Sequence, residues 1–177
     1  APGRFVPPKI QALTGITNQD LRERGIPKTR LCRDVAELIS GDRTLLLAYN
    51  AHFDLSFLFY ALRRDGDPAV LKGKDKLDLL TVYRDRRAYP HRLASAIEAY
   101  GLQDRVQNSH RAIDDVLATV AVLQAMWEER DDLLRYINLF GYNARYGLEG
   151  KPISSVVYRP QGYEPGRPVY ERVEAGV

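Results

Sequence analysis

A run of three leucines stands out from the mostly helical pattern of hydrophobic positions in the first third of the chain. Residues 45–47 predict a buried strand over 44–49, because a short continuous apolar run suits a strand that is covered on both faces. The apolar positions that follow recur at helical spacing, so a helix is expected from about Asp54 to the turn at 66–68. Asp54 therefore lies where a strand leads into a helix, and open α/β sheets bind ligands at such junctions.

Local signals predict several short helices in the first half of the chain. Residues 1–12 are rich in proline, and two adjacent prolines there predict an extended chain rather than a helix. Thr17 or Asn18 can cap a short helix over 19–24, since both side chains accept hydrogen bonds from backbone N–H groups. A second helix is expected over 30–40, with an apolar stripe formed by Leu31, Val35, Leu38 and Ile39.

The second half contains one segment that permits two structures. Residues 77–81 can form a short strand or the start of a helix. Further helices are expected over 93–100, where Gly101 stops the pattern, over a long segment after Ser109 and over 131–139. The spacing predicts that the apolar face of the long helix comprises Ile113, Val116, Leu117, Val120 and Leu123.

The composition changes after Gly141, where glycine, proline and tyrosine become frequent. An isolated strand is expected over 153–158, and further prolines restrict regular structure beyond it. The sequence therefore predicts a main domain over 1–140 and a C-terminal appendage over 141–177. Helices outnumber strands in this interpretation, and the sheet has fewer strands than an α/β domain of this length normally contains.

The length and composition of the chain restrict the class of protein more than they restrict its function. A chain of 177 residues with 45% hydrophobic and 28% charged residues is typical of one soluble globular domain. It has no apolar run long enough to span a membrane and no signal-peptide pattern at its start. Its single cysteine, Cys32, excludes an internal disulfide framework and fits a reducing compartment such as the cytoplasm.

Positive charge concentrates in the middle of the chain, although the net charge is only +3 and the pI is about 9.0. Basic clusters occur at 63–64, 72–76 and 84–87, and such clusters can contact nucleic-acid phosphates. A solvated surface with interspersed acids explains the same clusters and is the favoured interpretation. Charge alone therefore neither requires nor excludes a nucleic-acid partner.

Three residues together suggest a specific chemistry: Asp54, His110 and Asp115. Carboxylates from different elements can hold Mg²⁺ or Mn²⁺, which prefer oxygen ligands. A pair of such ions can activate a water molecule and stabilise the leaving oxygen in phosphodiester cleavage. A histidine beside the ions can act as general base, because its pKa lies near neutrality. Each residue alone is more often a helix cap or a surface group, so the hypothesis depends on the combination.

Two motifs and one loop resemble the DEDDh exonucleases, the DnaQ-like group. Asn50-Ala51-His52-Phe53-Asp54 resembles the second signature of that family, and His110-Arg111-Ala112-Ile113-Asp114-Asp115 resembles the third. Leu13-Thr14-Gly15-Ile16-Thr17 is similar to the loop between the third strand and the first helix of these enzymes. The order and spacing of all three agree, and the resemblance covers roughly residues 5–140.

The resemblance implies an α/β fold of the RNase H-like exonuclease type, with a mixed sheet flanked by helices. It also implies hydrolysis of nucleic acid from the 3′ end to nucleoside monophosphates by a two-metal mechanism, with Mg²⁺ or Mn²⁺ as the ions. The expected partner is the 3′ end of single-stranded DNA, and a DNA polymerase is a candidate second partner. The alternatives are an exonuclease for short RNA and a non-catalytic nucleic-acid-binding or polymerase-associated module.

The same resemblance assigns roles to individual residues. Asp54 and Asp115 would be metal ligands, and His110 would deprotonate the attacking water. The residues expected near the terminal nucleotide are Phe53, Thr14, Gly15 and Ile16, with Asn50 supporting the geometry of the site. The residues expected to have no catalytic role are His52, Asp78, His91 and Asp114.

One family signature has no counterpart in the chain. The Asp-X-Glu motif of the first strand supplies two of the four carboxylates in the family, and the residues before Leu13 leave no room for it. We therefore expect an N-terminally cropped enzyme that lacks its first three strands, which would explain the small number of strands in the sheet. The chain as given is then expected to show little or no hydrolysis, and a degenerate relative without activity is the alternative.

Overall fold

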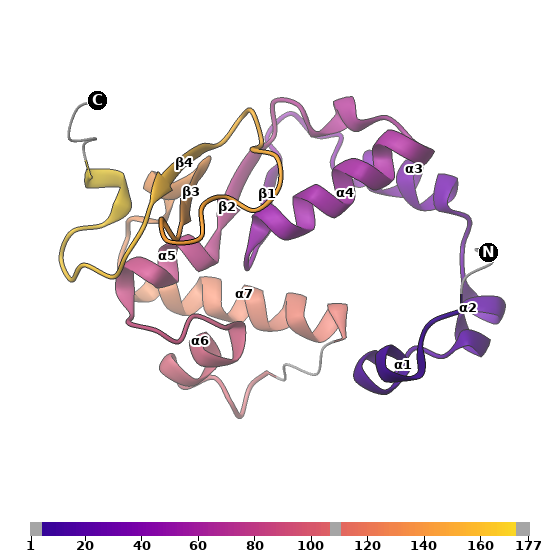
Figure 1. Cartoon of the computed structure of the whole chain (residues 1–177), viewed down its shortest axis with the longest axis horizontal. Coiled ribbons are helices and arrows are strands. Elements are labelled where there is room, and N and C mark those ends of the chain that lie inside the picture. Colours follow the sequence, from indigo (N-terminus) through magenta and orange to yellow (C-terminus); the bar gives the residue numbers. More distant parts are fainter. Residues whose placement is uncertain (1–4, 107–110, 173–177) are drawn as a thin grey trace.

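The computed structural model describes residues 5–106 and 111–172, and Figure 1 shows that helices dominate it. The α-helices of this part are α1 (Pro8–Thr14), α2 (Asn18–Arg24), α3 (Lys28–Leu38), α4 (Ala51–Asp65), α5 (Leu79–Arg86), α6 (Leu93–Ala99) and α7 (Ala112–Glu129). The strands are β1 (Leu45–Ala48), β2 (Asp75–Asp78), β3 (Leu139–Tyr142) and β4 (Val157–Pro160), and the 3-10 helices are η1 (Pro68–Leu71), η2 (Leu133–Tyr136) and η3 (Val169–Glu171). No helix in the described residues is long and apolar enough to cross a membrane.

Strands β1 and β2 form a small parallel sheet, and α4 connects them. Ala48 at the end of β1 lies opposite Asp78 at the end of β2. The predicted strand over 44–49 is confirmed. The ambiguous segment 77–81 contains both structures, because β2 ends and α5 begins within it.

Strands β3 and β4 form a second parallel sheet. The predicted boundary after residue 140 falls inside β3, so this sheet joins the main part of the chain to the C-terminal segment. The strand expected over 153–158 occurs slightly later, as β4.

The β1–β2 sheet lies between α4 and α7 (Figure 1). Leu47 and Leu77 belong to the main core, together with the buried face of α7. Leu46 and Ala48 belong to a smaller core with the first turns of α4. Successive side chains of a strand point to opposite faces, so the leucine run supplies both cores.

The structure of the N-terminal segment contradicts the expected extended chain. Helix α1 begins at Pro8, the second proline of the adjacent pair. Proline is tolerated at the first helical position, because its missing N–H would have no intrahelical partner there and its φ already suits a helix. The helix ends at Gly15, whose N–H donates to the Gln11 carbonyl oxygen at 2.8 Å.

The buried face of α7 also differs from the predicted one. Ile113, Val116, Leu117 and Val120 are between 40% and 62% exposed. The residues that α7 buries are Ala118, Thr119, Ala121, Val122 and Met126. Leu123 is the member of the predicted face that packs against the core, where it is partly buried. The small side chains of Ala118 and Ala121 let α7 approach its neighbours closely, and Val122 and Met126 fill the space beside them.

Two further helix predictions needed correction. The helix expected over 131–139 is a single 3-10 turn, η2, followed by β3. Asn138 accounts for the change, because its N–H donates to Lys76 O at 2.8 Å and its Oδ1 accepts from Lys76 N at 3.0 Å, which ties the chain to β2. Helix α3 occupies its predicted segment, but Leu31 and Leu38 of its predicted stripe are exposed.

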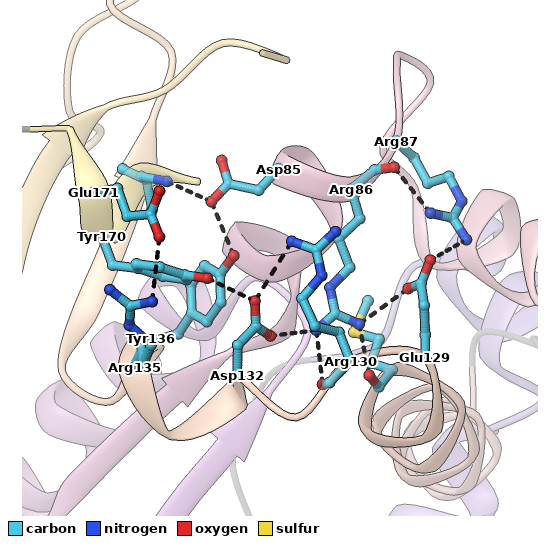
Figure 2. A network of polar contacts seen from close by, with 12 residues as sticks. Asp85, Arg86, Arg87, Glu129, Arg130, Asp132, Arg135, Tyr136, Tyr170 and Glu171 are labelled. Atoms are coloured by element: carbon cyan, nitrogen blue, oxygen red, sulfur yellow. Dashed lines mark hydrogen bonds and ion pairs between the residues drawn. The ribbon is translucent and has the colours of Figure 1, made fainter. Parts of the chain in front are cut away.

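A buried polar network joins the C-terminal segment to α5 (Figure 2). The Arg86 guanidinium donates to Asp132 Oδ1 at 2.6 Å. Asp85, beside it on α5, accepts hydrogen bonds from the Tyr136 hydroxyl at 3.1 Å and from the Val169 N–H at 2.6 Å. Buried charges avoid most of the cost of dehydration when they are paired and hydrogen-bonded. The network therefore fixes η2 and η3 against the same buried helix.

Candidate active site

A left-handed turn positions the start of α4. Asn50 has a φ of 68°, a conformation that asparagine adopts more readily than most residues. The Asp78 carboxylate accepts hydrogen bonds from the Asn50 and Ala51 N–H groups at 2.9 and 3.0 Å. The same carboxylate caps α5, because it also accepts from Leu80 N–H and from the N–H and hydroxyl of Thr81. These bonds fit the structural role predicted for Asp78.

Asp54 lies in the first turn of α4, directly after this left-handed turn. The positive end of the helix dipole favours a carboxylate at this place. Loss of hydration nevertheless raises the pKa of Asp54, and the negative charge of Asp78 adds to the rise. A bound cation would act in the opposite direction, since a nearby positive charge favours the ionised carboxylate. A cation bound at Asp54 would therefore lower this pKa again.

Asp115 occupies the first turn of α7 and contains a buried oxygen atom. This atom, Oδ1, has no hydrogen-bond partner within the described part of the chain. Such a buried oxygen is unfavourable, and native proteins contain few of them. A divalent cation would satisfy it, because Mg²⁺ and Mn²⁺ bind oxygen ligands. Asp115 therefore fits the predicted ligand role on an observation that is independent of the motif.

The glycine loop after α1 lies beside the start of α7 (Figure 1). Gly15 has a φ of 67°, and a Cβ atom placed on it would lie 3.9 Å from Arg111 Nε. Glycine suits this position because other side chains are strained at such a φ. Arg111 directly precedes α7. The fold thus brings residues 14–16 to the end of α7 that carries Asp115.

The structure does not assemble all predicted site residues into one cluster. Asp54 and Asp115 lie in the first turns of α4 and α7, and these helices cover opposite faces of the β1–β2 sheet (Figure 1). Within 5–106 and 111–172, no group of three or more His, Cys, Asp or Glu side chains is arranged to hold a metal ion. His110, the predicted base, lies outside the described residues. The two carboxylates have the chemistry that a cation requires, but a complete metal centre needs more ligands than these two.

Comparison with known proteins decides the family. A protein-family model described as "Exonuclease" matches residues 1–123. The chain belongs to this exonuclease family. Over 132 residues it is 32% identical to the 3′-5′ exonuclease DinG of Bacillus subtilis (strain 168), a match that covers 72% of this chain and 13% of that protein. The resemblance of its motifs to the DEDDh exonucleases is thereby confirmed.

Solved structures of exonuclease I have the same fold. The zinc-bound complex of E. coli exonuclease I with single-stranded DNA matches with a TM-score of 0.63 and 26% identity, over 75% of this chain and 32% of that one. The complex of E. coli exonuclease I with a dA16 oligonucleotide matches with a TM-score of 0.63 and 25% identity, over the same shares. The predicted RNase H-like α/β fold is confirmed. The exonuclease chain spans only a minor part of the length of these relatives.

Exonucleases of this family generally depend on divalent metal ions. Asp54 and Asp115 could serve as ligands of such an ion, because both are carboxylates in first helical turns and Asp115 has a buried oxygen without a partner in the described part. The family match thus supports the predicted chemistry of the site. Which metal ion binds, and how many, stays a prediction.

Both histidines that were expected to be non-catalytic have structural partners. The ring nitrogens of His52 contact Tyr158 Oη and Glu149 O, each at 2.6 Å. The Nε2 atom of His91 contacts Arg87 O at 3.0 Å. His52 therefore attaches the C-terminal segment to α4, a positioning role that its place inside the motif did not indicate.

A groove beside the exonuclease site was also missed by the sequence analysis. It has a volume of about 850 Å³ and lies between α4, η1 and residues 149–155. Asn50 and Phe53 line it, and so do Phe57 and Tyr60. The sequence did contain a signal for one wall of the groove, because these aromatic residues recur along α4 at a helical spacing. The opposite wall comes from a distant part of the sequence, which no local pattern connects to α4.

Proposed function

We propose that the protein is a metal-dependent 3′→5′ exonuclease that removes nucleoside monophosphates from single-stranded DNA. The observation that supports this most directly is the buried Oδ1 of Asp115, which has no hydrogen-bond partner within the described residues. In a chain of the exonuclease family, a divalent cation is the natural partner for such an oxygen. The names of the similar proteins agree, since one is a 3′-5′ exonuclease and another is a complex with single-stranded DNA.

In this proposal Asp54 and Asp115 would hold a pair of Mg²⁺ or Mn²⁺ ions together with further ligands. When bound, such ions polarise the phosphate and lower the pKa of a water ligand. His110 accepts the proton of the attacking water. The water oxygen then bonds to phosphorus while the bond to the 3′ oxygen of the preceding nucleotide breaks, which releases the terminal nucleoside 5′-monophosphate.

The remaining predicted residues position the terminal nucleotide. Phe53 is 56% exposed beside Asp54, so its ring is available to contact a base or sugar. Residues 14–16 form the loop near the start of α7 and supply backbone groups to the same region. Asn50 sets the direction of the first turn of α4 through its left-handed conformation.

A second candidate is a non-catalytic nucleic-acid-binding module, associated with a DNA polymerase. One observation favours it: the described residues contain no cluster of three metal-ligating side chains. Such a module would bind nucleic acid in a salt-dependent way without turnover.

An exonuclease assay separates these candidates. The full-length product of the gene is incubated with 5′-labelled single-stranded DNA and Mg²⁺ or Mn²⁺, and a matched RNA oligonucleotide tests the choice of sugar. We expect shortening from the 3′ end that EDTA abolishes. Asp54→Asn and Asp115→Asn should each lower the rate by about 100-fold or more, because removing a ligand disrupts the metal centre.

Asp114→Asn is the matched control, because it removes a neighbouring carboxylate that has no assigned role in catalysis. Its rate should stay within about twofold of the parent. Activity that persists in EDTA, or equal rates for the Asp114 and Asp115 variants, would exclude the proposed mechanism. Salt-dependent binding without any shortening would favour the non-catalytic module.

A further inference from the structure

The groove of about 850 Å³ shares two lining residues, Asn50 and Phe53, with the candidate active site. Helix α4 forms one wall, η1 with residues 72–73 forms another, and residues 149–155 of the C-terminal segment form a third. Asn50 and Phe53 line the groove and also belong to the exonuclease motif. A polymer whose end lies at the active site could therefore continue into this groove.

Three aromatic rings on α4 are exposed along the groove. Phe53, Phe57 and Tyr60 follow one another at spacings of four and three residues, which places them on one face of the helix. Their exposed fractions are 56%, 66% and 53%. The rings of Phe53 and Phe57 have centroids 4.8 Å apart and are tilted by 49°, so their outer surfaces remain open. Exposed rings of this kind are the stacking surfaces on which proteins hold unpaired bases.

The charged residues of the groove favour an anionic polymer. Lys72 and Lys151 are exposed on different walls. The basic residues that line the groove, which include the buried Lys76, outnumber its two acids, Asp67 and Glu149. Two open ammonium groups beside a row of aromatic rings match the alternating phosphates and bases of a single strand.

The wall formed by the C-terminal segment is attached to α4 by specific bonds. His52 contacts Glu149 O through Nε2 and Tyr158 Oη through Nδ1, each at 2.6 Å. The Tyr158 hydroxyl oxygen also accepts a hydrogen bond from the Ile153 N–H at 3.2 Å. Ile153 packs against the smaller core, whose members include Leu55 of α4. Polar and apolar contacts thus hold residues 149–153 beside the aromatic face.

We propose that this groove binds single-stranded nucleic acid, taking the nucleotides that adjoin the terminal one. The bases stack on Phe53, Phe57 and Tyr60, and Lys72 and Lys151 contact the phosphates. The C-terminal segment is then part of the substrate-binding surface, with His52 as the residue that positions it. The direction of the strand rests on the proposed function, whereas binding in the groove can be tested without any hydrolysis.

The test measures binding of a fluorescein-labelled oligothymidylate of about twelve nucleotides by fluorescence anisotropy, in EDTA so that hydrolysis is prevented. Phe57→Ala should weaken binding by about 5- to 100-fold, the range expected for loss of one base–aromatic stack. Phe57→Trp should bind at least as well as the parent, because it retains the stacking surface. Lys151→Ala should weaken binding and reduce the slope of log Kd against log salt by about 0.7.

Two variants outside the groove serve as controls. Tyr146→Ala removes an exposed ring of the C-terminal segment, and Lys28→Ala removes an exposed ammonium group of α3. Absence of binding by the parent, or equal affinities of groove and control variants, would overturn the proposal. Asp115→Asn should bind like the parent in EDTA. Loss of hydrolysis with intact groove binding, or the reverse, therefore shows which of the two proposals has failed.

Discussion

The buried carboxylate of Asp78 offers a sharp test of how the fold holds the start of α4. Its Oδ1 accepts from the N–H groups of Asn50, Ala51 and Leu80, at 2.9 to 3.2 Å. Its Oδ2 accepts from the N–H and the hydroxyl of Thr81, at 3.2 and 2.8 Å. Asp78→Asn replaces one of these oxygens with an NH₂ group, which must face donors whichever way the amide turns.

The expected cost follows from these contacts. A hydrogen bond to a charged group contributes about 1.5–3 kcal/mol, and a helix N-cap contributes about 1 kcal/mol. The asparagine oxygen can keep the bonds of one carboxylate oxygen and loses those of the other. We therefore expect the free energy of unfolding to fall by about 2–4 kcal/mol, which for a chain of this size lowers the Tm by about 5–15 °C.

Urea unfolding followed by circular dichroism measures this loss, and Asp75→Asn is the matched control. Asp75 lies at the other end of β2 and is exposed, where its carboxylate accepts a hydrogen bond from Asn138 Nδ2 at 2.8 Å. Its replacement should cost no more than about 0.5 kcal/mol. Hydrogen exchange of the Asn50 and Ala51 amides should accelerate only in the Asp78 variant. Equal stabilities of the two variants would refute the role assigned to Asp78.

Two other predictions concern charged groups. Arg86→Met leaves the buried Asp132 carboxylate without its closest cation, so the free energy of unfolding should fall by about 3–5 kcal/mol, and adding Asp132→Leu should recover part of it in the same urea titration. Burial raises the pKa of Asp54 in the folded chain, so without metal the contribution of Asp54 to stability should decline as the pH rises above the ordinary carboxyl value of 3.8, and the parent should lose stability relative to Asp54→Asn. Thermal unfolding in EDTA between about pH 4 and pH 7 measures that decline, and an unchanged pH dependence in Asp54→Asn would contradict it.

Local sequence signals were sufficient to predict the structure wherever it depends on residues that are close together in the sequence. Thr17, one of the two N-caps that the sequence allowed, caps α2, and it forms a reciprocal capping box with Asp20. The strand at 44–49 and the stop at Gly101 follow from equally local rules. The motifs around Asp54 and Asp115 could be recognised from the sequence for a similar reason, since each is defined by residue types and spacings within one short segment.

The sequence by itself therefore determined the family, the fold class and most helices and strands of the described part. Only the tertiary structure decided which face of α7 is buried, because the elements packed against the helix cover Ala118, Val122 and Met126 and leave Leu117 exposed. It also decided that Asp78 organises the turn before α4 and that residues 149–155 form a groove with the aromatic residues of α4. Such arrangements join segments that are distant in sequence, and their free energy comes from burial and hydrogen bonds that exist only after the chain has folded.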